Sequence, residues 1–577
     1  MKRILNLLTA ALIILMLSAI ALQNSFANGP VNKSVPLQTS ESGQNSVAKI
    51  GSKEQKDDKM AWWHEAKFGM FIHWGLYAIP GNSSEWHMRN LKKSIAEYSK
   101  YAEQFNPTLF NADEWAEIAR DAGMKYMVIT TKHHDGFALF KSKASPYNMV
   151  DATPFKRDII KELAGACPKH DIRLGLYYSL MADWGHRGGG IGCPPWDPAQ
   201  IGNIETYFNT VAYPQVKELL TNYGTVAELW FDTDGPEKPT PDQAARIDSL
   251  IKLQPLMIVN NRVVRGDFTN MERHIPAQAI KGTWEGCDLI IEGSWGYKHF
   301  KPTDVRSLSS LVRELIDVVS KGGNMLLNVG PKPDGTFPGE TLDRLKGIGA
   351  WMKVNGEAIY GTTASPFDYL PWGRCTRKGD NLYLHVFNWP ADGKIRIPMP
   401  NKVASAWLLS DKSKNRLKYK TIKGELTLNV PAVAPDSIAS VIVLQVNGEI
   451  QPTYSIALNK PTEASVSGEL SKYTVDGYPS SGWEITKAVP AWLTVDLQTP
   501  KTFNTVRIGG RAKGAKFSVD RWKDGQWVPI FSDENMPDDI YVKKFDPVTA
   551  QRVRFNIREA DPLQGIRINS FELFDAH

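Results

Sequence analysis

Strand-like and helix-like segments alternate along residues 60–362, and this alternation restricts the fold of the chain more than any other feature. The strand-like segments, among them Phe68–Ile72 and Tyr126–Thr131, are short apolar runs without regular polar alternation. Strands of that kind are buried on both faces and pair in parallel through helical connections. Asn111 and Glu114 have the spacing of a capping box at the start of a helix. The pattern therefore predicts repeated strand–helix units.

Further segments extend the same pattern. Strands are predicted at residues 173–178, 226–231, 256–260, 289–291 and 325–329, and helices at residues 158–166, 214–224 and 308–320. No Gly-rich phosphate-binding motif follows the first strand, which argues against a dinucleotide-binding fold. At this length the pattern favours a (β/α)8-like barrel over residues 60–362 rather than an open doubly wound sheet.

The pattern changes after Thr362 to short strands separated by Gly, Pro and Asn turns, so we expect a multidomain protein. Residues 363–447 are predicted to form a β-sandwich with strands at 382–387, 394–397, 404–409, 426–430 and 440–446. A short linker leads to a second all-β region at residues 453–577.

The first residues have the pattern of a Sec-type signal peptide. Two basic residues precede an apolar run over residues 4–22, and Ser25 and Ala27 supply the small side chains of a cleavage site. We therefore expect residues 1–27 to be removed and the protein to be exported, periplasmic or secreted, with no membrane association afterwards. An uncleaved anchor is the alternative. Residues 28–59 are rich in Ser, Gln, Gly and Lys and are expected to form a flexible spacer.

Charge and cysteine content exclude several protein classes. Lys plus Arg number 68 and Asp plus Glu 62, so the net charge of +6 does not suggest a nucleic-acid-binding protein. The four cysteines are widely spaced without a paired motif and predict neither a disulfide framework nor a zinc site. The 18 Trp and 19 Tyr residues suit sugar binding, because flat rings with a polar edge pack against sugar faces.

Polar and aromatic side chains stand at the ends of four successive predicted strands, at the end where a barrel carries its active site. They are His73, His133 with His134, Tyr177 with Tyr178, and Trp230 with Asp232. One such group could be ordinary packing, but four in succession predict a site. Aromatic rings, histidines and a strand-end carboxylate, without a phosphate loop, favour glycoside hydrolysis.

Glycoside hydrolysis needs two carboxyl groups, which in retaining enzymes lie about 5–5.5 Å apart and act as nucleophile and acid/base. Asp232 is the expected nucleophile because a strand holds it rigidly. Glu272, Glu285 and Glu292 are alternatives for the acid. A metal-dependent hydrolase using residues 133–135 is disfavoured, since adjacent strand residues point to opposite faces, and no catalytic metal is expected.

A series of short motifs between residues 62 and 362 indicates the protein family more specifically. They are FGMFIHWG (68–75), SEW (84–86), KHHDGF (132–137), WFD (230–232), WEGC (284–287), SWGY (294–297), LNVGPKPDG (327–335) and NGEAIYG (355–361). This set resembles the α-L-fucosidases of glycoside hydrolase family 29. The resemblance implies release of terminal α-linked L-fucose from fucosylated oligosaccharides or glycoconjugates, with retention, through a covalent fucosyl–enzyme intermediate and without a cofactor. A non-catalytic glycan-binding protein with a retired barrel is the alternative.

The same resemblance implies roles for single residues. Asp232 matches the nucleophile and Glu272 the acid/base, although Met271 stands where the family more often has Pro. Glu285 is the runner-up acid, and a structural role is favoured for it. The residues expected to hold the fucose hydroxyls or line the pocket are His73, Glu85, Trp86, His133, His134, Tyr178, Trp230, Arg262 and Trp295. Convergent donors and acceptors suit sugar hydroxyls, and an apolar wall suits the methyl group.

The C-terminal region has a resemblance of its own. ALNKP (457–461), Asp476-Gly477, Trp483 and WLTVDL (492–497) are similar to the opening of discoidin-like (coagulation factor 5/8 type C) domains. The resemblance implies a jelly-roll β-sandwich over residues 453–577. Such domains often bind sugars and carry a structural calcium ion, and a purely structural module is an equal alternative.

Overall fold

The computed structural model describes residues 54–190, 192–232, 238–263, 266–276, 279–280, 282–367, 370–422, 425–450, 455–476, 482–485, 489–537, 539–560 and 565–575. The predicted signal peptide, residues 1–27, and residues 28–53 of the predicted spacer lie outside these ranges. Helix α2 (Glu54–Ala66) begins before the predicted boundary at residue 60. Along the described residues, no helix combines the length and apolar composition that a membrane span requires.

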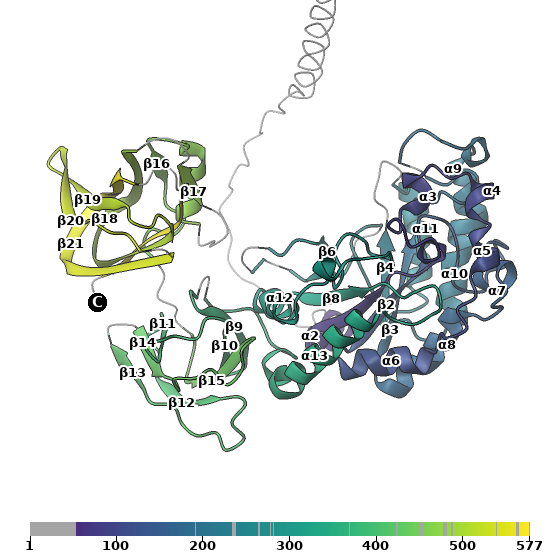
Figure 1. Ribbon diagram of the computed structural model, residues 1–577, viewed down its shortest axis with the longest axis horizontal. Helices are drawn as coiled ribbons and strands as arrows, with labels where there is room; N and C mark the ends of the chain where they lie inside the picture. The colour runs from purple at the N-terminus through teal and green to yellow at the C-terminus, as the bar shows by residue number, and fades with distance from the viewer. Residues whose placement is uncertain are drawn as a thin grey trace, which may run out of the picture. The chain divides into compact units, whose positions relative to one another are not determined.

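Eight parallel strands form the sheet of the first domain, in the order β5-β4-β3-β2-β1-β8-β7-β6 (Figure 1). They are β1 (Phe68–Ile72), β2 (Tyr126–Lys132), β3 (Arg173–Ser179), β4 (Glu228–Asp232), β5 (Ile258–Val259), β6 (Thr269–Glu272), β7 (Trp284–Leu289) and β8 (Asn324–Val329). The edge strands β5 and β6 meet through a parallel bridge between Asn260 and Phe268, and the amide of Asp267 donates to the carbonyl of Val259 at 2.7 Å. The predicted (β/α)8-like barrel is therefore confirmed.

Helices connect the strands and cover the outside of the sheet (Figure 1). The longer ones are α6 (Ala112–Asp121) after β1, α8 (Ile159–Ala166) after β2, α10 (Tyr213–Asn222) after β3, α11 (Pro241–Ile251) after β4, α12 (Leu308–Ser320) after β7 and α13 (Gly339–Asn355) after β8. Shorter ones are α3 (His87–Asn90), α4 (Ile95–Tyr98), α5 (Tyr101–Gln104), α7 (Met149–Ala152) and α9 (Ile204–Tyr207). The side chain of Asn111 accepts hydrogen bonds from the amides of Asp113 and Glu114, so it caps α6 as predicted.

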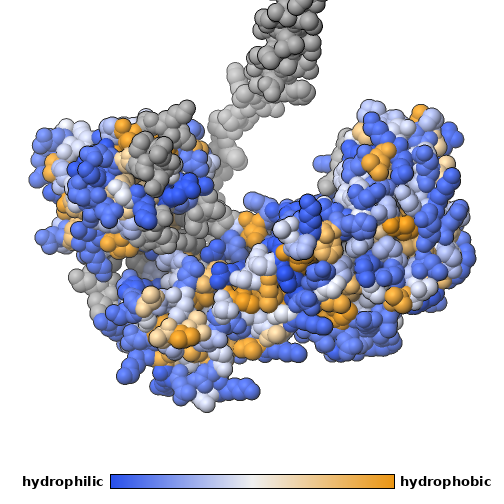
Figure 2. Space-filling model, in the orientation of Figure 1, coloured by the Kyte–Doolittle hydropathy of each residue, from blue (hydrophilic) through white to orange (hydrophobic). Residues whose placement is uncertain are grey.

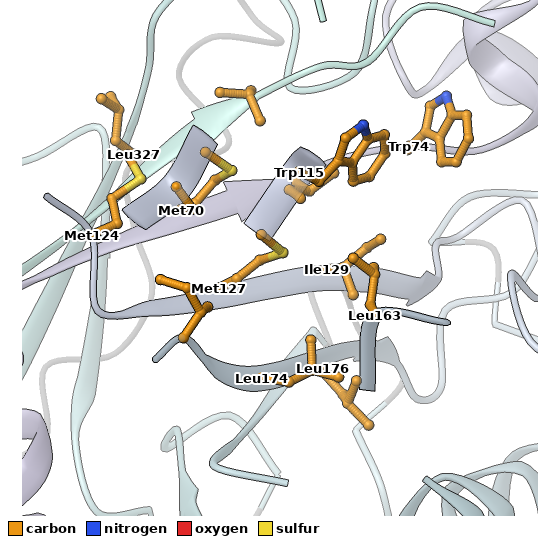
Figure 3. Close-up of a cluster of buried hydrophobic side chains, with 14 of the residues drawn as sticks. Met70, Trp74, Trp115, Met124, Met127, Ile129, Leu163, Leu174, Leu176 and Leu327 are labelled. Carbon is orange, nitrogen blue, oxygen red and sulfur yellow. The ribbon is translucent and has the colours of Figure 1, made fainter. Parts of the chain in front are cut away.

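Alternate residues of each strand pack on opposite sides of the sheet. Met70, Ile129 and Leu176 face the helices, where they pack with Trp115 and Leu163 (Figure 3). A second buried cluster contains residues that point into the barrel, among them Trp63, Phe71, Tyr126, Val128, Tyr177, Trp230, Phe268 and Leu326. The strands are apolar on both faces because both faces are buried.

Two strands of the barrel differ most from the sequence prediction. β7 occupies residues 284–289 rather than 289–291, since Glu285 and Gly286 interrupt the apolar run while their backbone still pairs with β6 and β8. β6 is missing from the predicted strands because three of its four residues are polar and all four are partly or fully exposed. Both strands therefore depend on pairing with their neighbours more than on an apolar pattern.

A β-sandwich follows the barrel, as predicted. One sheet has the order β12-β15-β10-β9 and the other β11-β14-β13. The strands are β9 (Gly373–Lys378), β10 (Asn381–Val386), β11 (Lys394–Ile397), β12 (Val403–Leu408), β13 (Tyr419–Ile422), β14 (Glu425–Asn429) and β15 (Ser440–Val446). Tyr383, Val441 and Val443 belong to the same buried cluster as the outer core of the barrel, so the two domains share a core.

The C-terminal domain is also all-β, as predicted. Its sheet has the order β17-β22-β18-β21-β19-β20, with β16 paired to β18. The strands are β16 (Thr462–Ala464), β17 (Trp483–Ile485), β18 (Ala491–Arg511), β19 (Lys516–Lys523), β20 (Gln526–Asp533), β21 (Asp539–Glu559) and β22 (Ile566–Asp575). This domain has a hydrophobic cluster of its own. The face of the molecule seen in Figure 2 is largely hydrophilic, with scattered hydrophobic residues.

Candidate active site

The predicted strand-end residues meet at the carboxyl edge of the barrel. Asp232 is the last residue of β4, and its residue surface is 8% exposed. His73 directly follows β1, and His133 and His134 directly follow β2. Trp295 comes from the segment after β7, and its ring centroid lies 5.3 Å from that of His73. The barrel therefore brings together side chains from four strand ends, as a (β/α)8 active site requires.

Asp232 is held by three neighbouring groups. The hydroxyl of Tyr177 donates to Oδ2 at 2.6 Å, and the guanidinium of Arg262 donates to Oδ1 at 2.7 Å. Nε2 of His134 lies 3.4 Å from Oδ2. Burial alone would raise the pKa of Asp232, but the charges of His134 and Arg262 and the Tyr177 hydrogen bond hold it below its ordinary value. Asp232 is therefore ionised in the free protein at neutral pH.

The histidines are positioned by hydrogen bonds and by burial. Nδ1 of His73 lies 2.7 Å from Oδ1 of Asn328, and Nδ1 of His134 lies 2.7 Å from Oγ of Ser179. Burial lowers the pKa of His73 to about 4 and that of His133 well below its usual value. Both rings are neutral at neutral pH, and a neutral imidazole can donate one hydrogen bond and accept another. The two rings therefore suit sugar hydroxyls, which can both donate and accept hydrogen bonds.

Glu85 fixes the segment that carries Trp295. Its Oε2 accepts hydrogen bonds from Oγ of Ser294 (2.9 Å) and from the amides of Trp295 (2.9 Å) and Gly296 (3.2 Å). Trp86, the next residue in the chain, places its ring 5.5 Å from that of His134. The predicted residues Glu85, Trp86 and Trp295 thus lie at one side of the cluster, with Glu85 acting on the backbone of its neighbours.

Arg262 joins the two carboxylates for which the family resemblance implies catalytic roles. Besides its bond to Asp232, its guanidinium forms an ion pair with Oε1 of Glu272, the last residue of β6. The side chain of Glu272 is 33% exposed, so it lies at the open side of the site. The guanidinium also lies over the ring of Trp230, 4.9 Å from the centroid. One cation therefore spans a buried carboxylate and a more accessible one.

Glu285 lies elsewhere. It pairs in register with Asn324, the first residue of β8, and Oε2 accepts a hydrogen bond from the hydroxyl of Tyr126 at 2.7 Å. Its electrostatic neighbour Glu228 is the first residue of β4, about 13 Å along the strand from Asp232 at 3.3 Å per residue. Burial raises the pKa of Glu285 to about 7. The runner-up acid therefore sits at the amino end of the strands.

Tyr178 is the one predicted pocket residue that the structure turns away from the others. Its side chain packs among the outer core residues, and its hydroxyl donates to Oε1 of Gln215 at 2.8 Å. Tyr177 takes the expected position, because adjacent strand residues point to opposite faces and residue 177 is the inward one. The local sequence carries no signal for this choice, since both faces of β3 are apolar. Glu292 forms an ion pair with Arg273.

A group of potential metal ligands is present in the same site. His133, His134 and Asp232 each offer one ligand atom, and these atoms lie within 4.8 Å of one another. The expectation that adjacent residues point to opposite faces of a strand does not apply to the two histidines, because they follow the end of β2. Asp135 is not part of this group, and its carboxylate accepts a hydrogen bond from the hydroxyl of Tyr98 at 2.9 Å. No other group of three His, Cys, Asp or Glu side chains was found among the described residues, so we assign no ligands to a calcium ion in the C-terminal domain.

The chain resembles known proteins in two regions. The family model described as alpha-L-fucosidase matches residues 35–357, and the F5/8 type C domain model matches residues 460–569. Plasma alpha-L-fucosidase of Homo sapiens is 33% identical over 389 residues, which cover 60% of this chain and 80% of that protein. The solved alpha-L-fucosidase isoenzyme 1 from Paenibacillus thiaminolyticus has a TM-score of 0.64 and 35% identity, covering 68% of this chain and 100% of that one.

A third solved structure shows a reaction intermediate of a relative. It is a GH29 alpha-L-fucosidase from Bacteroides thetaiotaomicron, trapped as a covalent intermediate with 2-fluoro-fucosyl fluoride in a Glu-to-Gln mutant. Its TM-score is 0.62 and its identity 30%, covering 72% of this chain and 100% of that one. The matched family model spans more than half of the chain, and the matching regions cover the barrel and most of the C-terminal domain described above. The chain therefore belongs to the alpha-L-fucosidases of glycoside hydrolase family 29 and carries a C-terminal F5/8 type C domain.

Proposed function

We propose that the protein is a retaining exo-α-L-fucosidase that releases terminal α-linked L-fucose from fucosylated oligosaccharides or glycoconjugates. The observation that carries this proposal is the bridge of Arg262 between Asp232 and Glu272 at the carboxyl edge of the barrel. One guanidinium contacts the buried, ionised Asp232 on one side and the more exposed Glu272 on the other. Retaining hydrolysis requires such a pair, a nucleophile and an acid/base.

Asp232 acts as the nucleophile. Its depressed pKa keeps it ionised, and the Tyr177 hydroxyl and Arg262 guanidinium fix its two oxygens. Attack on the anomeric carbon breaks the bond to the leaving oxygen and forms a covalent fucosyl ester. The neutral rings of His73 and His133 hold sugar hydroxyls, and the ring of Trp295 supplies an apolar surface for the methyl group.

Glu272 acts as acid and then as base. In the first step it must hold a proton for the leaving oxygen, so Arg262 has to turn from Glu272 to an oxygen of the bound sugar. Formation of the ester removes the negative charge of Asp232, and Glu272 then accepts a proton from the water that hydrolyses the ester. The covalent intermediate trapped in the Bacteroides thetaiotaomicron relative supports this two-step course. The position of Glu285, at the amino end of the strands, does not suit an acid.

Export of the protein is part of the same proposal. The N-terminal pattern of residues 1–27 is that of a signal peptide, and the human relative is named a plasma enzyme. We propose a periplasmic or secreted enzyme with a catalytic domain at residues 60–362, a β-sandwich at 363–447 and the F5/8 type C domain at 453–577.

Chemical rescue tests both catalytic assignments. We expect Asp232→Ala to lose hydrolysis of an aryl α-L-fucoside while still binding fucose, with azide producing the β-fucosyl azide. Glu272→Ala should keep more activity on an aryl fucoside than on a natural fucoside, with azide producing the α-fucosyl azide, because the nucleophile remains. Glu285→Ala is the matched control and should give no rescue.

Two results would contradict the proposal. Rescue confined to Glu285→Ala would move the acid/base from Glu272 to Glu285. A wild-type protein that binds fucose but does not hydrolyse aryl fucosides would instead support the non-catalytic glycan-binding alternative.

A further inference from the structure

The hydrogen bonds around His134 fix which of its ring nitrogens carries a proton. The hydroxyl of Ser179 donates to the carbonyl of Ala182 at 2.6 Å, since a carbonyl oxygen can only accept. A hydroxyl has one proton, so Oγ of Ser179 has to accept the hydrogen bond that joins it to Nδ1 of His134 at 2.7 Å. Nδ1 of His134 therefore carries a proton, and the free electron pair of the neutral ring lies on Nε2.

Nε2 of His134 lies next to the proposed nucleophile. It is 3.4 Å from Oδ2 of Asp232, and both residues are buried. Two atoms that both offer electron pairs repel each other at this distance in a buried site unless a positive species lies between them. A proton on Nε2 is one such species, and a metal ion bound to both atoms is another.

The distance between these two atoms fits a small transition-metal ion. Zn²⁺ binds histidine nitrogens and carboxylate oxygens at about 2.0–2.2 Å in a tetrahedral arrangement, which places neighbouring ligand atoms about 3.4 Å apart. Nε2 of His134 and Oδ2 of Asp232 have this separation, 3.4 Å. Mg²⁺ instead prefers an octahedral set of oxygen ligands. The mixed nitrogen and oxygen set therefore favours Zn²⁺ over Mg²⁺.

His133 supplies a third ligand. One ligand atom from each of His133, His134 and Asp232 lies within 4.8 Å of the other two, so small side-chain movements complete the set. Nδ1 of His133 is buried, and no hydrogen-bond partner for it is found in the described part of the chain. A buried polar atom without a protein partner is typical of a site that a water molecule or an ion completes.

Neighbouring groups orient the ligands and set the charge of the site. Metal-binding histidines usually have a hydrogen-bond partner on the nitrogen that does not bind the ion, and Ser179 is that partner for His134. Oδ2 of Asp232 accepts the Tyr177 hydroxyl and keeps a second electron pair, while Arg262 bonds to Oδ1. The charge of Arg262 opposes a second cation, so the affinity should be lower than that of a structural zinc site.

We propose that His133, His134 and Asp232 form an inhibitory binding site for a divalent transition-metal ion such as Zn²⁺. The ion engages the proposed nucleophile and two histidines of the pocket, so it excludes fucose. Binding of the ion follows from the geometry of the three side chains, whereas its competition with fucose rests on the proposed function.

Isothermal titration calorimetry with ZnCl₂ tests the site directly. We expect the wild-type protein to bind zinc, and we expect His134→Ala and Asp232→Asn to raise Kd at least tenfold. Ser179→Ala should raise Kd roughly tenfold, because partners of metal-binding histidines typically contribute about 10–100-fold to affinity. MgCl₂ should not compete with zinc.

His170→Gln is the matched control. Nε2 of His170 also lies 3.4 Å from a carboxylate oxygen, Oδ1 of Asp113. Asp113 is bonded to Lys169 as well, and no third ligand of this kind joins the pair among the residues that the structure describes. His170→Gln should leave Kd for zinc unchanged, and circular dichroism should show that all variants are folded.

Steady-state kinetics on an aryl α-L-fucoside measures the consequence for the enzyme. Zn²⁺ should raise the apparent KM without changing kcat, and EDTA should restore the original KM. Saturating fucose should abolish zinc binding in calorimetry, because both ligands need the same side chains.

Each arm of the experiment has a contrary result. Wild-type Kd values in His134→Ala and Asp232→Asn, weaker binding in His170→Gln, or a lower kcat at constant KM would overturn the inference. A wild-type Kd in Ser179→Ala would overturn the proton position assigned to His134. Weaker binding in His134→Ala and Asp232→Asn without displacement by fucose would place the ion in a pocket that does not hold fucose, and would contradict the proposed function instead.

Discussion

Asp232 carries a negative charge in a buried position because neighbouring groups offset the cost of removing it from water. His134 and Arg262 supply positive potential, and Tyr177 donates a hydrogen bond. Hydrogen bonds to charged groups contribute about 1.5–3 kcal/mol each. The hydroxyl of Tyr177 therefore adds to the charges of His134 and Arg262 in keeping Asp232 ionised, and the sequence alone does not distinguish Tyr177 from Tyr178.

Tyr177→Phe removes this donor without changing the shape of the side chain. Because the hydrogen bond lowers the pKa of Asp232, its loss should raise that pKa. The acidic limb of the profile of kcat/KM against pH should move to higher pH, and kcat/KM at its maximum should fall about tenfold or more. Steady-state kinetics on an aryl fucoside across the pH range measures both effects.

Tyr178→Phe provides the control for this prediction. It removes a hydroxyl that is bonded to Gln215 on the opposite side of the sheet. Its acidic limb should coincide with that of the wild type. If Tyr178→Phe shifted the limb and Tyr177→Phe did not, the assignment of the inward tyrosine would fail.

The barrel carries buried carboxyl side chains at both ends of its strands, in different electrostatic surroundings. At their carboxyl ends lies Asp232, which is stabilised as an anion. At their amino ends lie Glu228 and Glu285, both fully buried and electrostatically coupled. Burial raises the pKa of Glu285 to about 7 and that of Glu228 well above its usual value. One element, β4, thus carries a carboxylate that favours ionisation at one end and a carboxyl that favours its proton at the other.

The amino-end pair makes stability depend on pH. These carboxyls hold their protons more tightly in the folded state, so the folded protein binds more protons than the unfolded one between pH 4.5 and about 7. The pair therefore makes the free energy of unfolding decrease as pH rises through this window. Glu228→Gln should weaken this decrease. Urea unfolding at a series of pH values measures it.

An exposed glutamate serves as the comparison. Glu117→Gln, on the outer surface of α6, should leave the slope of stability against pH as in the wild type. A Glu228→Gln protein with the same slope as the wild type would show that the pair titrates alike in the folded and unfolded states.

The barrel and the β-sandwich that follows it are joined by packing and by hydrogen bonds. Arg313 of α12 donates to the carbonyls of Ile438 at 2.9 Å and of Phe387 at 3.0 Å. Nε1 of Trp351 on α13 donates to the carbonyl of Ala439 at 3.2 Å. Together with the shared buried cluster, these contacts predict that the two domains unfold as one cooperative unit.

Arg313→Ala should lower the stability of that unit. The substitution leaves two partly buried carbonyls without their donor, which costs about 2 kcal/mol in the free energy of unfolding. The melting temperature in differential scanning calorimetry should fall. The value of kcat/KM on an aryl fucoside should stay near that of the wild type, because the guanidinium of Arg313 donates to carbonyls of the β-sandwich and not to residues of the site.

Lys346→Ala, at an exposed position of α13, controls for loss of a positive charge and should leave the melting temperature unchanged. Separate transitions for the barrel and the β-sandwich in the wild type would contradict the cooperative unit.

The sequence determined the order of strands and helices, the capped start of α6 and the identity of most strand-end residues, because these follow from local periodicity and local turn chemistry. It predicted the helix over residues 308–320 with the bounds that α12 has in the structure. It missed β6, three of whose four residues are polar. It placed β7 too late in the chain, since Glu285 and Gly286 interrupt the apolar run while their backbone still pairs with the neighbouring strands.

Only the tertiary structure decided which side chains meet. Both faces of a barrel strand are buried, so the sequence does not show which of two adjacent side chains points into the barrel. The closure of the barrel places Tyr177 inward and Tyr178 outward. Arg262 reaches both Asp232 and Glu272 because the edges at β5 and β6 come together, although these residues are far apart in the chain. Glu285, the runner-up acid from the WEGC motif, lies at the amino end of the barrel because it pairs in register with the first residue of β8. Contacts between distant segments depend on register and closure, and local patterns do not record either.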